Sequence, residues 1–152
     1  MTETEPTTDH ERASDPKLAA IEGFFTAYAD GDRTGIADVL AEDIAWTIPG
    51  HHPLAGTKHG IDEVLAFFDA LGVVGFQAET FFLQSGGDFV VDIRRGYSTG
   101  GTGAVDTNWA LVWHFNPDGK VDSVINLSAD QHQMDSFIWD NFSLAAIPTR
   151  LA

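Results

Sequence analysis

The order of two hydrophobic periodicities limits the fold of this chain more than any other feature. Before residue 75, apolar residues recur at helical spacing in two stretches: Leu18, Ile21, Phe25 and Tyr28, and then Ile61, Val64, Leu65, Phe68 and Leu71. After it, the segments 76–84, 88–97, 105–115 and 120–127 read as strands between turns rich in Gly, Ser, Asn and Pro. Helices followed by strands, rather than strict alternation of the two, indicate an α+β fold.

The remaining elements follow from local signals. Asp15 and Pro16 are typical of a helix start, and Gly31 of its end; a short helix through Leu40 and a strand over 44–48 come next. A loop is expected over 51–60, and the capping box formed by Ser128 and Gln131 predicts a last helix reaching residue 142. We therefore expect a cone: a strongly curved, mostly antiparallel sheet wrapped on N-terminal helices, with an apolar concavity suited to a small molecule.

One domain accounts for most of the chain. Residues 1–15 are polar and acidic and predict a flexible tail, residues 16–143 the folded domain, and residues 144–152 a C-terminal extension. The acidic start lacks the basic and apolar runs of a secretion signal, so a cytoplasmic protein is expected.

Charge and composition exclude several functions. The 152 residues carry a net charge of −15, with 8 basic side chains against 23 acidic ones, which is unsuited to neutralising nucleic-acid phosphates. The absence of cysteine excludes disulfides and thiolate metal sites, and no apolar window is long enough to span a membrane. Two origins of the acidity remain open, a salt-rich cytoplasm or an acidic protein from a high-GC organism.

Three stretches carry a resemblance to a known family. They are FFTAYADGD (24–32), WTIPGHHPLAGTKHGIDEVLAFF (46–68) and INLSADQHQMDSFIW (125–139). The chain resembles SnoaL-like proteins of the nuclear-transport-factor-2-like (ketosteroid isomerase-like) superfamily over roughly 17–139. The resemblance implies a cystatin-like or SnoaL-like α+β barrel that often pairs as a homodimer through the outer face of the sheet. It does not fix an activity, because the superfamily holds cyclases, isomerases, epoxide hydrolases and non-catalytic binders.

The family's catalytic positions narrow the choice. Ketosteroid isomerase has functional side chains where this chain has Ile48, Phe24 and Leu111, so that mechanism is not expected. Epoxide hydrolases of this fold use an Arg-x-Asp pair and a further Asp, whereas this chain has Asp92, Arg94 and Asn126.

The resemblance thus implies cofactor-free acid/base chemistry of the cyclase, isomerase or hydrolase type. In it Asp92 would be the acid/base, Arg94 its electrostatic partner and Asn126 an orienting group. The alternatives are a non-catalytic binder of a small apolar or carbonyl-containing molecule, and a dimeric interaction module.

The face of the sheet that carries Asp92 and Arg94 is left open by the sequence. Phe89, Val91 and Ile93 form the apolar set of that strand, so simple alternation puts the charged pair outside, whereas the family alignment puts it inside.

The expected pocket combines aromatic residues with the first-strand end and the adjacent histidines. Its members are Phe24, Tyr28, Trp46, Ile48, His51, His52, Phe68, Trp109, Leu111 and Trp113. The two histidines have three possible roles: packing in the loop, contact with a ligand or proton transfer, and binding of a metal. We predict that no metal is bound. Trp139 either packs or covers the mouth of the cone.

Overall fold

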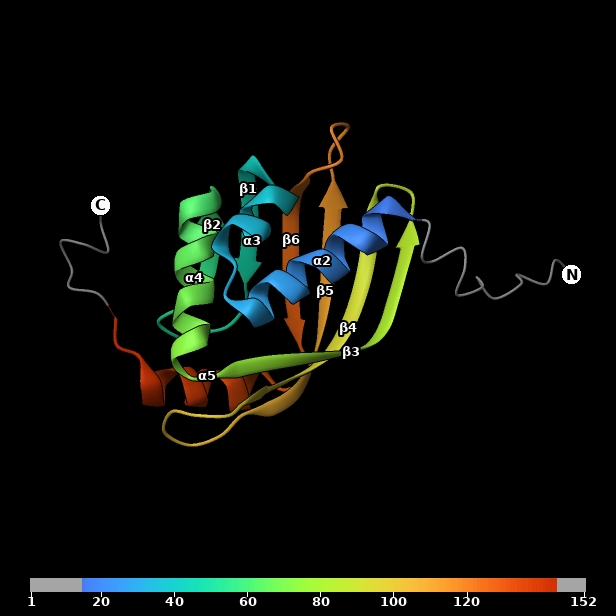
Figure 1. The fold of residues 1–152 in the computed structure, drawn as a ribbon. Coiled ribbons are helices and arrows are strands. Elements are labelled where there is room, and N and C mark those ends of the chain that lie inside the picture. The colour runs from blue at the N-terminus through green and yellow to red at the C-terminus, as the bar shows by residue number, and fades with distance from the viewer. Residues whose placement is uncertain (1–14, 145–152) are drawn as a thin grey trace, which may run out of the picture.

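The computed structural model describes residues 15–144, which form helices lying across one face of a single curved sheet (Figure 1). Of the predicted tail over 1–15 and the predicted extension over 144–152, residues 1–14 and 145–152 lie outside the described residues. In chain order the elements are α2 (Pro16–Asp30), α3 (Arg33–Val39), β1 (Leu40–Ile48), β2 (Gly56–His59), α4 (Ile61–Val73), β3 (Phe76–Gly86), β4 (Phe89–Ser98), β5 (Asp106–Phe115), β6 (Val121–Ser128) and α5 (Gln131–Asn141). The predicted α+β class is confirmed.

Helix ends follow the capping chemistry of the sequence, with one correction. Asp15 caps α2 by accepting a hydrogen bond from the backbone N–H of Lys17 at 2.9 Å, and Gly31 ends it in the left-handed conformation at φ 68°. The prediction that Ser128 opens the last helix is wrong. Ser128 is paired with Trp109 in the sheet, and Asp130 caps α5 instead by accepting from Gln133 N–H at 3.0 Å.

The sheet has the strand order β2-β1-β6-β5-β4-β3. All neighbouring strands are antiparallel except β1 and β6, which run parallel and bring the first strand of the chain against the last. The loop expected over 51–60 is wrong in part, because the polar residues of β2 pair with β1 at the edge of the sheet. The strand expected to start at residue 44 starts at Leu40, which was assigned to the preceding helix.

The register settles which face of β4 points inward. Asp92 lies opposite Leu111, which lies opposite Asn126, and this row faces the helices. Asp92 is 0% and Arg94 5% exposed, whereas Phe89 is 48% exposed on the other face. The family alignment therefore gave the correct face, and simple alternation gave the wrong one.

An aromatic cluster fixes the helices to the sheet. Phe24 on α2, Phe68 on α4, and Trp46 and Trp113 on the sheet have ring centroids 5.1–5.5 Å apart, mostly edge to face. Trp46 and Phe68 of this cluster also face a cavity between the helices and the sheet.

Candidate functional site

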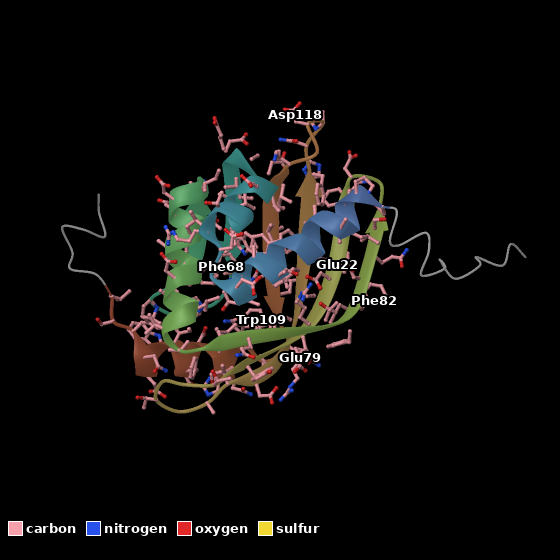
Figure 2. All side chains as sticks on the ribbon, viewed as in Figure 1. Glu22, Phe68, Glu79, Phe82, Trp109 and Asp118 are labelled. Carbon is pink, nitrogen blue, oxygen red and sulfur yellow. The ribbon has the colours of Figure 1, made fainter. Side chains whose placement is uncertain are left out.

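A cavity of about 60 Å³ lies between α2, α4, α5 and the inner face of the sheet. Its wall is almost wholly apolar, and Figure 2 shows two of its residues, Phe68 on the helical side and Trp109 on the sheet. Nine of the residues named from the sequence line it: Tyr28, Trp46, Ile48, His52, Phe68, Arg94, Trp109, Leu111 and Asn126.

Four of the named residues do not line the cavity. Phe24 and Trp113 are fully buried in the aromatic cluster behind the wall, and Asp92 is fully buried behind Arg94. His51 is exposed, and its carbonyl accepts a hydrogen bond from the Trp139 indole at 2.6 Å. Trp139, itself 48% exposed, thus fastens α5 to the loop after β1.

Asp92 and Arg94 form a buried ion pair two residues apart on β4. Arg94 Nε donates to Asp92 Oδ2 at 2.7 Å, and its guanidinium carbon lies 3.3 Å from the centroid of the Phe25 ring. Burial raises the pKa of the Asp92 carboxyl, and the charge of Arg94 offsets part of that rise. No further hydrogen bond of the guanidinium is present within residues 15–144, and Arg94 also lines an open groove beside Glu22, whose charge acts on it together with that of Asp92.

The indole nitrogens of the wall differ in their partners. Trp46 Nε1 donates to Asn126 Oδ1 at 2.8 Å, which holds the amide at the cavity wall. Trp109 Nε1 is buried and has no acceptor among the described residues. The edge of the Trp109 ring lies over Gly96, where a Cβ atom would come within 2.9 Å of Nε1. A buried donor without an acceptor costs on the order of 1–3 kcal/mol, so its persistence calls for a partner.

His52 is the one titratable side chain besides Arg94 and Tyr28 on the described part of the wall. Its Nδ1 accepts from Leu54 N–H at 3.1 Å, which places the proton on Nε2 in the neutral ring. Nε2 lies 4.0 Å from Asp135 Oδ1, beyond hydrogen-bond reach. Burial lowers the pKa of His52, against the opposing effect of Asp135.

Several lining residues were not named from the sequence. Leu71, Met134 and Ile138 belonged to predicted helical stripes, where nothing separates a core position from a cavity wall, and Phe67 lay beside the stripe of its helix. Gly96 and Ala78 have small side chains that leave room for neighbouring rings, and their small size was the one feature of the sequence that pointed to them. Phe76 opened a predicted strand.

Two kinds of feature are absent from the described residues. No group of three or more His, Asp or Glu in this part of the chain is placed to hold a metal ion. Among the helices of residues 15–144, none is long and apolar enough to cross a membrane.

Solved structures with the same architecture establish the fold. An NTF2-like protein from Burkholderia pseudomallei superposes with a TM-score of 0.73 at 24% identity, covering 82% of this chain and 98% of that one. TerC, co-crystallized with polyporic acid, superposes with a TM-score of 0.72 at 21% identity, covering 82% of this chain and 98% of that one.

Sequence relatives are more limited. An uncharacterized protein from Mycobacterium tuberculosis is 36% identical over 52 residues, which is 34% of this chain and 40% of the length of that relative. The family model for the SnoaL-like domain matches residues 21–124, more than half of the chain. The chain therefore belongs to the SnoaL-like domain family.

Proposed function

We propose that this protein binds a small, flat, largely apolar molecule that carries a carbonyl oxygen. One observation carries the proposal: the polar groups without partners at the cavity wall are hydrogen-bond donors. They are Trp109 Nε1–H and, in the tautomer set by the Leu54 N–H contact, His52 Nε2–H, both buried in a mostly apolar wall.

An acceptor oxygen is the matching ligand group. A carbonyl between these donors would satisfy them while its ring contacts the surrounding aromatic side chains. No Asp or Glu side chain is among the described lining residues, so a cationic ligand would lack a counter-charge there. Because Asp92 already balances the charge of Arg94, a neutral carbonyl suits the site better than a strong anion.

The size of the cavity restricts how such a ligand is held. At about 60 Å³ it lies well below the roughly 300–1,000 Å³ of typical small-molecule pockets, so a ring enters only when wall side chains shift. Met134 is an unbranched, adaptable side chain on α5 and suits this role. TerC, which has the same fold, was co-crystallized with polyporic acid, which supports a small-molecule ligand.

Two probes of nearly identical shape test the proposal. Acetophenone carries a carbonyl where α-methylstyrene carries a CH₂ group, so their affinity ratio isolates the oxygen. We expect acetophenone to bind roughly two- to twelvefold more tightly, measured by calorimetry or by NMR titration, since one hydrogen bond contributes roughly 0.5–1.5 kcal/mol.

The Trp109→Phe variant is the matched control for the donor. It removes the N–H and leaves an aromatic ring, so the ratio should fall towards one while the affinity for α-methylstyrene stays within about twofold. Equal affinity of the wild type for the two probes would refute a carbonyl site.

A second candidate function is cofactor-free acid/base chemistry on the bound carbonyl compound. The observation that favours it is His52, a titratable ring on the wall with Asp135 4.0 Å from its Nε2. For His52 to act as the base, its ring proton has to move to Nδ1, which breaks the contact with Leu54 N–H. Nε2 would then remove a proton from the carbon next to the carbonyl, and the Trp109 donor and the charge of Arg94 would stabilise the enolate.

Proton exchange tests this chemistry without knowledge of the natural substrate. In D₂O, a working base exchanges the methyl protons of acetophenone for deuterium, which ¹H NMR follows as a loss of the methyl signal. We expect exchange above the buffer rate in the wild type and none in His52→Asn, with both measured at saturating acetophenone so that a change in affinity does not account for the loss. Exchange in neither would leave the protein a binder.

We further propose a homodimer formed through the outer face of the sheet. Two rows of the register place apolar residues together there: Val91, Val112 and Ile125, and next to them Ile93, Ala110 and Leu127. Ile125 and Leu127 are 44% and 53% exposed. An apolar patch of this kind is typical of a surface that pairs with another protein surface.

A further inference from the structure

We infer that the ligand extends from the cavity, past Tyr28 and Phe76, into an outer groove between α2, α4 and the start of β3, so that it consists of a ring with a flexible tail ending in a neutral polar group. The inference rests on the proposed function, because it takes the ring to lie in the cavity.

The cavity and the outer groove differ greatly in size. The outer groove measures about 460 Å³, against about 60 Å³ inside. The cavity alone is too small for a typical small-molecule ligand, whereas the two spaces together fall within the usual range of roughly 300–1,000 Å³.

The two spaces share one wall. Five residues line both of them: Phe25, Tyr28, Phe68, Phe76 and Ala78. Within this wall Tyr28 is held by one hydrogen bond, since its Oη donates to the Phe76 carbonyl at 2.6 Å, and its ring stands edge-on to Phe68 at 5.4 Å. Rotation of the Tyr28 side chain about its own bonds would join the cavity to the groove without moving the backbone.

The chemistry of the outer groove differs from that of the cavity. Its inner part is aromatic, whereas its rim carries the Arg33–Asp69 ion pair and the exposed amide of Gln77. These groups offer both hydrogen-bond donors and hydrogen-bond acceptors. They carry no excess of positive charge that could attract an anion to a protein of net charge −15. A hydroxyl or amide at the end of an alkyl chain therefore matches the rim better than a carboxylate or phosphate.

Two glycines make a matched pair of variants. Gly72 on α4 lines the outer groove only, and Gly23 on α2 lines none of the described pockets. Both are exposed, and a Cβ atom at either would meet nothing within 4 Å. Gly72→Trp therefore fills the groove, while Gly23→Trp introduces the same side chain elsewhere.

The experiment compares acetophenone with 4′-(6-hydroxyhexyloxy)acetophenone by calorimetry. We expect the tailed ketone to bind the wild type at least tenfold more tightly than acetophenone. Gly72→Trp should remove that gain while leaving the affinity for acetophenone within about twofold, and Gly23→Trp should change neither value.

The outcomes separate the two proposals. If acetophenone shows no preference over α-methylstyrene, the carbonyl site fails, and this inference fails with it. If acetophenone binds as expected but the tail adds nothing, or if Gly72→Trp leaves the gain intact, only the outer groove is refuted.

Discussion

Removing one partner of the buried Asp92–Arg94 pair should destabilise this protein more than removing both. In Asp92→Leu the Arg94 guanidinium stays in place without its counter-charge, in a side chain that is only 6% exposed. The double variant Asp92→Leu/Arg94→Met replaces the pair by apolar groups of similar length that suit the surrounding wall.

The magnitudes follow from the burial of the pair. With a side-chain exposure of 0% for Asp92, solvent screening is negligible, and an orphaned charge costs about 3–5 kcal/mol. For a chain of this size, 1 kcal/mol corresponds to roughly 2–4 °C in melting temperature, so Asp92→Leu should melt roughly 6–20 °C lower. The double variant should be as stable as the wild type, or more stable by up to about 4 kcal/mol.

Urea unfolding followed by circular dichroism and tryptophan fluorescence measures both variants. The neighbouring Arg95 supplies the control, because it forms a two-contact pair with Asp106 at 2.9 and 2.7 Å on the exposed face. Arg95→Met should leave the unfolding midpoint close to that of the wild type, since exposed pairs contribute little. A double variant no more stable than Asp92→Leu would refute the reasoning, because the cost would then arise from lost packing and not from an unpaired charge.

Three further predictions concern other sites. Burial lowers the pKa of His52 below 6.5, so the unfolded chain takes up the proton first and the stability of the fold should decrease as the pH drops below about 6.5. His52→Asn keeps an acceptor for Leu54 N–H, and its melting temperatures at pH 7.5 and pH 5.5 should differ less than those of the wild type. An equal difference would exclude His52 as the cause. Gly96→Ala places a Cβ atom 2.9 Å from Trp109 Nε1, so overpacking should lower the free energy of unfolding in urea by about 1–3 kcal/mol and weaken acetophenone binding. An unchanged affinity would mean that the Trp109 ring moves away from the cavity. Leu127→Lys should convert a dimer to a monomer in analytical ultracentrifugation, and a wild type that sediments as a monomer would contradict the proposed dimer.

Local sequence signals predicted most of the fold. The caps at Asp15 and Gly31 and the alternation over 105–115 correspond to α2 and β5 because each rests on neighbouring residues alone. The edge strand β2 escaped prediction because it is short and polar and is defined by pairing with β1. Ser128 was misassigned because its backbone was needed in the sheet, a requirement that a capping motif does not reveal.

The candidate site was less accessible to sequence reasoning. The inward position of Asp92 and Arg94 depends on the register between β4 and β5, which acts over distance and overrides the apolar pattern of the strand. The division between wall and core residues depends on side-chain packing. Trp109 lines the cavity, whereas Trp113, four residues further along the same face of β5, lies in the aromatic cluster. No periodicity distinguishes these two tryptophans.

The inverted pattern of β4 makes this strand locally frustrated during folding. A slip by one residue would exchange the buried ion pair for Val91 and Ile93, so hydrophobic burial favours the wrong register. The two-residue turn after β3 opposes that slip, since Gly87 takes the positive φ of 59° that a tight hairpin needs. The native register is thus imposed by the hairpin and by the pairing with β5. These contacts keep the Asp92–Arg94 pair inside, although the apolar residues of β4 alone would favour the opposite face.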